Sequence, residues 1–359
     1  MTRIAVAAWV GAGNTGDELI LSSLLRELRS FQFEPLVLSA NPVATKRDHE
    51  VDAVSHRRTW HAVSSVEGLI FGGGGLVQDR SSPWSPLYQL SRPWLASRRS
   101  CPVLAVGLGA EPLGRHISTR LVRSGLGRAS AIVARDRSSA SVLTHAGLPR
   151  VRCGADLVWL LETPPVTAED RVAVSLVPPA VVGSLLPASM RSRTPSAAFD
   201  PQLVSHLAVT LDGISEVTGL KIRFVSMDPK RDDPLHRAVA ERMHGPADVV
   251  SPDVHGVLEE FASARLVIAA RYHACLATLI AGRPLIALDY APKVRSLNEH
   301  RFRAMASVSF HQTSRVPSLT RVASKLLEIT PDPEDVLRVR QVAEINREEL
   351  ERFASLAGG

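Results

Sequence analysis

Polar side chains follow two apolar runs in the second half of the chain, at the point where each run ends. They are Arg271 and His273 after residues 266–270, and Tyr290 and Lys293 after residues 285–288. Because the carboxyl ends of parallel strands form the crevice in which an open α/β sheet binds ligands, we expect Arg271, His273 and Lys293 to face one small anion. Arginine offers a planar fork to a carboxylate or phosphate, lysine a point charge, and histidine a proton that moves near neutral pH. A salt bridge for Arg271 and a helix start for His273 are the structural alternatives, but three such residues at consecutive strand ends favour a site. Tyr290 is a further candidate for substrate binding.

A glycine-rich turn follows the first apolar run of the chain. Residues 11–16, Gly-Ala-Gly-Asn-Thr-Gly, match the pattern of a dinucleotide-binding turn. Two carboxylates, Asp17 and Glu18, follow where a pyrophosphate would need positive charge, so we expect neither NAD nor NADP there. Gly13, Asn14 and Asp17 are instead candidates for binding sugar hydroxyls, and a purely structural role for Asn14 and Asp17 is the open alternative. Glu18 matches the last position of a helix capping box, which indicates a structural role.

Two further glycine-rich segments, residues 72–75 and 107–109, follow apolar runs. Four consecutive glycines lose much conformational entropy when the chain folds. Such a cost is reasonable where the backbone must approach a helix or a ligand closely. We predict turns that open toward the same edge of the sheet as the first turn. Gly73, Gly74 and Gly109 are therefore candidates to line a large ligand.

Arg135 ends the apolar run at residues 132–134. We expect its side chain to point into the same crevice, and Ser138 to cap the helix that follows. A salt bridge between Arg135 and Asp136 is the structural alternative.

The order of apolar runs and helical patterns predicts two doubly wound α/β halves that face a cleft. Short apolar runs alternate with helical periodicity, which is typical of a parallel sheet covered on both faces. The predicted strands lie near residues 4–10, 35–38, 69–71, 103–106, 132–134, 172–176, 222–225, 266–269 and 285–288. We divide the chain into 1–162, 163–332 and a C-terminal amphipathic helix at 333–359, which we expect to pack across the two halves.

Composition limits the classes of partner. The chain has 359 residues, of which 45% are hydrophobic and 22% charged, and a net charge of +6. This charge suits phosphorylated substrates or peripheral contact with a membrane surface, whereas the 5% of aromatic residues and the lack of a dense basic run argue against nucleic acid. Three widely spaced cysteines give neither a disulfide framework nor a metal-ligand spacing. We therefore expect a cytoplasmic protein with no metal, in reach of the inner face of the membrane.

Seven stretches, in their order along the chain, resemble the polysaccharide pyruvyl transferase family. They are residues 11–21, 71–79, 105–110, 133–138, 154–156, 271–274 and 289–294. The resemblance implies a GT-B-like pair of Rossmann-like domains and transfer of a pyruvyl group from phosphoenolpyruvate onto sugar hydroxyls as a ketal. The acceptor it implies is a glycan or lipid-linked saccharide of the cell envelope, and phosphoenolpyruvate is a donor substrate rather than a cofactor. It also implies catalytic roles for Arg135, His273 and Lys293.

The chain departs from the family pattern at two places. Many members carry an arginine just after the first strand of the second half, where residues 175–179 here read Ser-Leu-Val-Pro-Pro. One anion contact is either missing or supplied elsewhere, for example by Arg191 or Arg193. The residue before His273 is Tyr272, where leucine is common.

Two other functions are compatible with the same pattern. A GT-B glycosyltransferase that uses a nucleotide sugar would have a similar architecture and a similar anion-rich cleft. A relative that binds a sugar or a phosphate without activity is the second alternative. Consumption of the donor separates the two enzymes, and the effect of losing His273 separates an enzyme from a binding protein.

Overall fold

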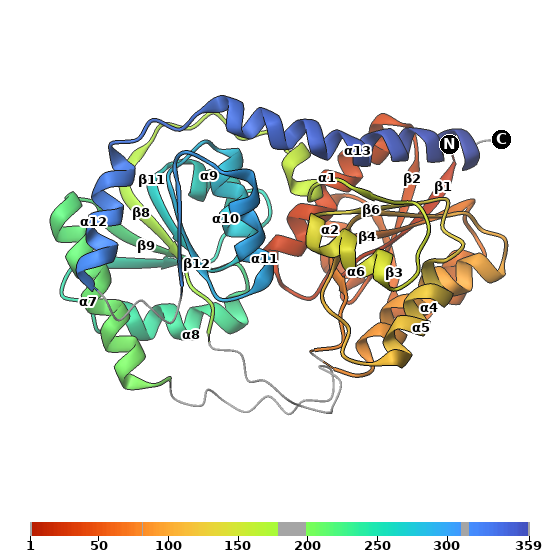
Figure 1. Cartoon of the computed structure of the whole chain (residues 1–359), viewed down its shortest axis with the longest axis horizontal. Coiled ribbons are helices and arrows are strands. Elements are labelled where there is room, and N and C mark those ends of the chain that lie inside the picture. The colour runs from red at the N-terminus through yellow and green to blue at the C-terminus, as the bar shows by residue number, and fades with distance from the viewer. Residues whose placement is uncertain (1, 81, 179–198, 310–315, 358–359) are drawn as a thin grey trace.

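Two parallel sheets, each covered by helices on both faces, make up the protein (Figure 1). The computed structural model describes residues 2–80, 82–178, 199–309 and 316–357. The first sheet has the order β3-β2-β1-β4-β5-β6-β7 and the second β10-β9-β8-β11-β12-β13. Both orders are those of a doubly wound sheet, with the first strand of each half in the interior, so the predicted fold class is confirmed.

The strands are β1 (Arg3–Ala7), β2 (Glu34–Ser39), β3 (Asp52–Ser55), β4 (Gly68–Val77), β5 (Val103–Ala110), β6 (Ala131–Ala134) and β7 (Val151–Cys153) in the first sheet, and β8 (Glu169–Ser175), β9 (Lys221–Val225), β10 (Ala247–Val250), β11 (Ala264–Ala269), β12 (Leu285–Asp289) and β13 (Met305–Ser309) in the second. The helices of the first half are α1 (Thr15–Ser30), α2 (Pro42–His49), η1 (His56–Arg58), α3 (Thr59–Val63), α4 (Ser85–Arg98), α5 (His116–Leu126), α6 (Arg137–His145) and η2 (Leu157–Leu160). Those that follow are α7 (Pro201–Thr218), α8 (Pro229–Ala240), α9 (Val257–Ala262), α10 (Tyr272–Ile280), α11 (Pro292–Arg295), η4 (Ser296–His300), α12 (Val316–Leu327) and α13 (Pro333–Ala357).

The apolar runs predict every interior strand but none of the edge strands. The four additional strands, β3, β7, β10 and β13, are the outer strands of the two sheets. They are short and largely half-buried, and β7 and β10 contain Arg152 and Asp248. Since an edge strand packs less apolar surface than a central one, its sequence lacks the continuous apolar run on which the prediction depends.

The glycine-rich segments lie inside strands, so the predicted turns at residues 72–75 and 107–109 are wrong. Residues 72–75 belong to β4 and 107–109 to β5. Gly72 has a φ of 142°, and a Cβ there would lie 2.2 Å from the carbonyl oxygen of Val106 on the neighbouring strand. The strand register between β4 and β5 shifts after Gly74. Glycine is thus required by close approach of two strands rather than by chain reversal.

Two helix starts differ from the prediction by one or two residues. Asn14 is the N-cap of α1, and a carboxylate oxygen of Glu18 accepts from the N–H of Gly11 at 2.8 Å instead of closing a capping box. Asp136 caps α6, where its side chain accepts from the N–H of Ser139 at 2.6 Å, whereas Ser138 lies inside the helix. Asparagine, aspartate and serine are comparable N-caps, so the choice among adjacent ones depends on the tertiary path of the chain.

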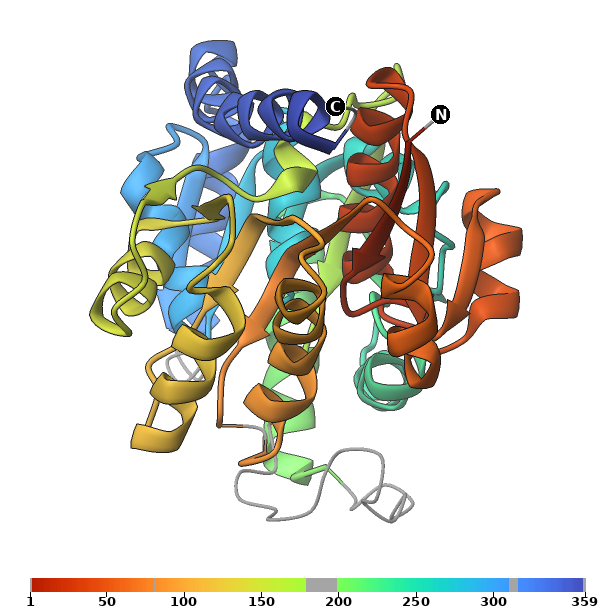
Figure 2. The ribbon, with the colours of Figure 1, turned by 90° about the vertical axis from the view of Figure 1, so that its right-hand side faces the viewer.

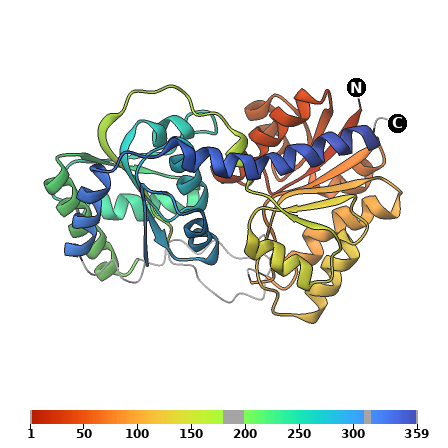
Figure 3. The ribbon, with the colours of Figure 1, turned by 45° about the horizontal axis from the view of Figure 1, so that its top comes forward.

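The predicted C-terminal helix is present as α13, which contacts elements of both halves (Figure 3). Near its start, Asp335 accepts from the N–H of Arg303 at 2.7 Å. Further along, Asn346 accepts from the N–H of Gly107 and donates to the carbonyl of Ala155, both at 2.9 Å. Phe353 is buried near its end. One apolar cluster runs from the first sheet through α1, η2, α10 and α13 to the second sheet.

No helix among the described residues has the length and apolar character needed to cross a bilayer.

Candidate functional site

The N-termini of α1 and α10 meet between the two halves. The N–H of Thr15 donates to the carbonyl of Met227 at 2.7 Å, which joins the halves directly through the backbone. The ring of His273 lies against Gly16, where a Cβ would be 2.3 Å from Nδ1. α1 follows β1 and α10 follows β11, so this contact brings together the carboxyl ends of interior strands from both sheets. The strand ends at which we expect the crevice therefore come from both halves.

Asp156 lies between charged groups from both halves. Its side chain is fully buried, and Oδ1 accepts from the N–H of Val158 at 3.1 Å as the N-cap of η2. Oδ2 is 3.8 Å from Nε2 of His273 and 4.0 Å from Nη1 of Arg135. Within the described residues, neither Oδ2 nor Nε2 of His273 has a hydrogen-bond partner. Each of these two atoms is therefore available for a hydrogen bond, either with the other atom or with a ligand.

The charge of Asp156 is set by opposing effects. Burial by itself raises the pKa of this carboxyl group, but the contact with His273 and the positive charge of Arg135 lower the pKa below its ordinary value on balance. Asp156 is thus an anion at neutral pH. It is the acidic partner of one histidine and one arginine that the sequence places among its catalytic candidates.

Arg135 is buried at the end of β6 and is held from three sides. Nε donates to Asp136 Oδ2 at 3.2 Å, and the guanidinium carbon lies 4.9 Å from the centre of the Tyr272 ring in the other half. A Cβ on Gly109 would be only 2.6 Å from that carbon, so glycine at this position leaves the space that Arg135 occupies. The structural alternative for Arg135, a salt bridge with Asp136, is therefore present, and the guanidinium also lies against Tyr272 of the other half.

Asp17 titrates close to neutral pH. Burial raises its pKa from 3.8 to about 6, while His273 and Lys293 act in the opposite direction. Nδ2 of Asn14 donates to Asp17 Oδ2 at 2.7 Å, and Oδ1 of Asn14 accepts from the N–H of Gly16 at 3.0 Å. Asn14 therefore caps α1 and also holds the carboxyl group of Asp17.

The raised pKa of Asp17 predicts a pH-dependent cost in stability. Because the folded protein binds the proton more tightly than the unfolded chain, the ionised side chain destabilises the fold progressively as pH rises from 3.8 to about 6, and fully above it. Asp17→Asn is expected to raise the free energy of unfolding at pH 8 by about 1 to 3 kcal/mol, and by much less at pH 4. Urea denaturation of both proteins at the two pH values measures this. A gain of equal size at both pH values would contradict the assignment.

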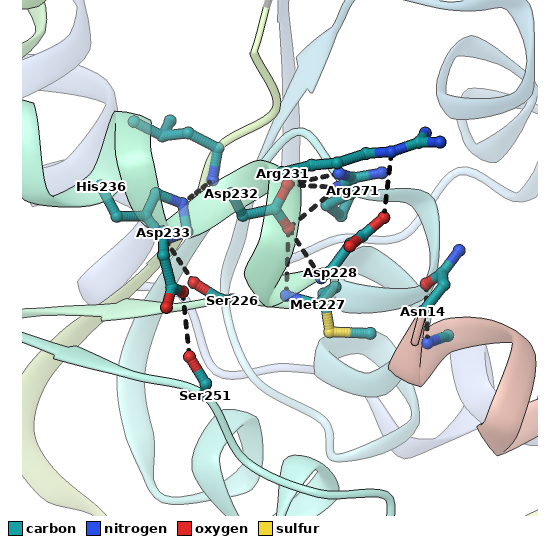
Figure 4. A network of polar contacts seen from close by, with 12 residues as sticks. Asn14, Ser226, Met227, Asp228, Arg231, Asp232, Asp233, His236, Ser251 and Arg271 are labelled. Atoms are coloured by element: carbon teal, nitrogen blue, oxygen red, sulfur yellow. Dashed lines mark hydrogen bonds and ion pairs between the residues drawn. The ribbon is translucent and has the colours of Figure 1, made fainter. Parts of the chain in front are cut away.

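Arg271 lies in a second polar network next to the first, seen in Figure 4. Nε of Arg271 lies 3.1 Å from Asp232 Oδ2, and Nη2 donates to Asp232 Oδ1. Asp232 also accepts from the N–H groups of Met227 and Asp228, at 3.1 and 2.9 Å. The structural alternative for Arg271 is thus realised as a salt bridge with a fully buried carboxylate. Its side chain keeps an exposed fraction of 14%.

His236 occupies the end of β8, where the family pattern leads to an arginine. Nε2 accepts from the N–H of Leu176 at 3.0 Å, so Nδ1 carries the proton and donates to Oγ of Ser226 at 2.9 Å (Figure 4). Burial lowers the pKa of His236 to about 4, which keeps the ring neutral. This histidine is therefore a structural partner of the strand end. Arg191 and Arg193, the other source of an anion contact, lie outside the described residues.

The remaining candidates are distributed unevenly around the crevice. Gly74 lies against Asp17, because a Cβ there would be 3.4 Å from Oδ1, whereas Gly73 makes its close contact with Ile20 of α1. Gly13 is exposed and open on the side where a Cβ would stand. Lys293, on α11, forms no ion pair within 4.0 Å among the residues that the structure describes, and its charge acts on Asp17. Tyr290 packs against two apolar clusters, one within the second half and one shared by both halves, and lies near Arg271.

The structure therefore brings Arg135 and His273 to Asp156, with Asp17 near both Asp156 and Lys293 and with Arg271 held by Asp232. Two acidic residues in this arrangement were not candidates. Asp156 is within a stretch that matches the family, which was the one available signal, while Asp232 stands in a charged helix start that gives none. In the described part of the chain, no cluster of three or more His, Cys, Asp or Glu side chains is arranged to hold a metal ion.

The chain can be compared with known proteins in sequence and in structure. Residues 14–292 match the model of the polysaccharide pyruvyl transferase family. No curated protein matches the chain in sequence.

Several solved structures share its architecture at very low sequence identity. The UDP-N-acetylglucosamine 2-epimerase of Rickettsia bellii superposes with a TM-score of 0.62 at 10% identity, over 99% of this chain and 96% of that one. S. aureus MnaA, solved with UDP, gives 0.60 at 11% identity over 98% and 95%. MurG of Acinetobacter baumannii gives 0.53 at 10% identity over 99% of both chains. These likenesses establish a GT-B-like fold and nothing about the substrate.

Proposed function

Since the chain belongs to the polysaccharide pyruvyl transferase family, we propose that it transfers a pyruvyl group from phosphoenolpyruvate onto two hydroxyls of a sugar as a ketal, and releases phosphate. The observation that supports this most is the cluster of Arg135, His273 and Lys293 at the junction of the two halves. It offers two fixed positive charges and one proton carrier within a single crevice. Phosphoenolpyruvate, with a carboxylate and a phosphate on a small carbon frame, matches that set.

We assign the donor anions mainly to the second half of the chain. Lys293 is the cation with the fewest protein partners in the described crevice, so it is suited to the phosphate as a point charge. Arg135 is held rigidly and is suited to the charge that develops during reaction, since a preorganised cation need not reorient. Arg271 contributes only the part of its guanidinium that Asp232 leaves free.

We assign the acceptor to the first half, residues 1–162, on the opposite wall from 163–332. Asn14 and Asp17 lie at the start of α1 with Gly13 and Gly74 next to them, and small residues leave room for a sugar ring. The acceptor we propose is a glycan or a lipid-linked saccharide of the cell envelope. The sparse, unpaired cysteines suit a reducing cytoplasm, so we place the reaction there, at the inner face of the membrane.

The reaction we propose needs one proton delivered to carbon and two removed from hydroxyls. Protonation of the donor methylene produces an oxocarbenium-like centre, which one sugar hydroxyl attacks as it loses its proton. The bond to phosphate then breaks, the second hydroxyl attacks the same carbon, and its proton leaves with the phosphate. His273 and Asp17 are the groups suited to these transfers, because His273 faces an ionised carboxylate and burial raises the pKa of Asp17 to about 6.

The test of this proposal uses the full chain, phosphoenolpyruvate and a panel of mono- and oligosaccharide acceptors. We expect release of inorganic phosphate and an acceptor product whose mass gain and acidity are those of a pyruvyl ketal. Calorimetry with phosphoenolpyruvate alone and with each acceptor provides a second readout that is independent of the choice of acceptor. If phosphoenolpyruvate fails to bind in all these mixtures while a nucleotide sugar is bound and turned over, the protein is a GT-B glycosyltransferase instead. Binding of phosphoenolpyruvate without turnover by any acceptor supports the inactive relative.

A further inference from the structure

Exposed aromatic and aliphatic side chains gather on the outer helical layer of the first half. Figure 2 looks onto this layer, in which α3, α4 and α5 lie together with α6 on the face of the sheet turned away from the second half. Its exposed large apolar side chains are Trp60, Trp84, Leu87, Tyr88, Trp94 and Ile117, and we call this set the aromatic surface. The chain has only five tryptophans, and three of them are 40% to 58% exposed here. Since exposed tryptophan is costly in water, three on one helical layer indicate an interaction surface.

Helix α4 has two apolar faces, of which the fold covers one. Leu90 and Ala96 face the core of the first half and are buried. Trp84, Tyr88 and Trp94 lie at helical spacing on the opposite side, where they are exposed. A helix that only packs on a sheet needs one apolar stripe, so the second stripe is not explained by the fold.

The same part of the sequence carries the positive charge of the whole protein. Residues 56–130 contain ten arginines, no lysine and three acidic residues, a surplus of seven positive charges, whereas the entire chain has a net charge of +6. Two of the acidic residues pair with arginines of the segment, because Glu111 lies 3.7 Å from Arg80 and the buried Asp79 lies 3.8 Å from Arg115. Arg92 is buried, and the exposed arginines that remain are Arg57, Arg58, Arg98, Arg99, Arg120, Arg123 and Arg128. The remainder of the chain is close to neutral by comparison.

Arginine and tryptophan are in direct contact on this surface. The guanidinium of Arg99 lies 3.9 Å from the centre of the Trp60 ring, and that of Arg98 lies 5.2 Å from the centre of the Trp94 ring. Each pair places a positive charge directly beside an indole. The border of a bilayer presents the complementary arrangement, in which anionic headgroups lie directly above the acyl chains.

We propose that the aromatic surface, with its surrounding arginines, docks on an anionic phospholipid membrane. The indole rings enter the headgroup region, the aliphatic side chains of Leu87 and Ile117 reach the acyl boundary, and the arginines bind lipid phosphates. A second copy of the chain fits poorly, since it would oppose two surfaces that both carry a surplus of positive charge. This docking goes beyond the proposed function and does not depend on it, because it concerns a different face of the molecule.

The experiment is flotation of the full chain with vesicles of phosphatidylcholine alone or with phosphatidylglycerol added. We expect the chain to float with the anionic vesicles at 0.1 M salt. With the neutral vesicles, most of the protein is expected to stay in the lower fractions. Raising the salt to 0.5 M shortens the screening length and is expected to weaken, but not abolish, the binding. Lipids brominated near the headgroup end of their acyl chains are expected to quench tryptophan fluorescence, since the indoles enter the adjoining headgroup region. Equal binding to neutral and anionic vesicles, or none to either, would overturn the proposal.

Two pairs of substitutions locate the binding on this surface. Arg98→Ala with Arg99→Ala removes two charges and is expected to weaken vesicle binding about 10- to 30-fold. Trp84→Ala with Trp94→Ala is expected to weaken it by about 10-fold or more and to reduce quenching by brominated lipid. Both pairs are exposed, so circular dichroism and the melting temperature should stay close to those of the unmodified chain.

Matched controls come from exposed residues of the second half. Val209→Ala with Val217→Ala, on α7, removes apolar side chains that are 50% and 60% exposed, and Arg242→Ala with Arg321→Ala removes two exposed charges. We expect vesicle binding within about twofold of the unmodified chain for both controls. An equal loss in the controls would refute the assignment to α3–α5. A dimer in sedimentation that the tryptophan substitutions dissolve, or tighter binding of duplex nucleic acid than of vesicles, would replace the membrane as the partner.

Discussion

Replacing His273 with alanine is expected to lower turnover of phosphoenolpyruvate by about 10²- to 10⁴-fold while donor binding changes by only a few-fold. The imidazole lies where the two halves meet, against Gly16 and 3.8 Å from the ionised carboxylate of Asp156. A group that moves a proton in the rate-limiting step lowers the barrier without adding to the affinity for the donor. Single-turnover kinetics together with calorimetry on the same protein separates the two quantities.

The control for this substitution is His145→Ala. His145 is exposed on α6 and bonds only within its own helix, to Ser141. We expect its loss to leave both turnover and binding unchanged. If His273→Ala instead abolishes donor binding and leaves the residual rate of bound donor intact, His273 is a cationic ligand of the phosphate rather than a proton carrier. If His273→Ala changes neither turnover nor donor binding, the chain is not an enzyme that uses this crevice.

The sequence predicts the interior strands of both sheets, because a strand that is buried on both faces contains a continuous apolar run. β1 and β11 are apolar except for one arginine each, and β8 contains the apolar run at residues 172–174, so the positions of these strands follow from the apolar residues alone. The edge strand β13, Met-Ala-Ser-Val-Ser, has four half-buried residues, one exposed residue and no continuous apolar run, so its sequence resembles that of a loop. The glycines of β4 were misassigned for a related reason, because the local sequence cannot show that Val106 of the neighbouring strand lies too close for a side chain.

In the site, too, the local sequence identifies some features, whereas others depend on contacts between distant residues. His273 and Lys293 follow strands directly, so the rule for strand ends finds them. What the sequence could not show is how each charge is paired. Arg271 and Asp232 are 39 residues apart, and only the fold reveals that the carboxylate already engages two nitrogens of the guanidinium. Asp156 likewise meets His273 only after the two halves come together, although a local motif marks its position.

Asp156→Asn is expected to lower turnover by about 10- to 100-fold, because the substitution removes the negative charge that faces both His273 and Arg135. Asparagine keeps the size of the side chain and an oxygen that can accept from the N–H of Val158, so η2 retains its cap. Thermal unfolding should therefore show a folded protein. The measured quantity is the maximal rate at saturating phosphoenolpyruvate, compared with that of the unmodified chain.

A double-mutant cycle then identifies the route by which Asp156 acts. If the carboxylate serves mainly to orient and stabilise the charged form of His273, adding Asp156→Asn to His273→Ala should cost less than about threefold, because the partner is already absent. A full additional loss of 10- to 100-fold would contradict this and assign the effect to Arg135, whose Nη1 is 4.0 Å from the same oxygen. A carboxylate that only capped η2 would give neither pattern, since asparagine preserves the cap and the single substitution would then be close to neutral.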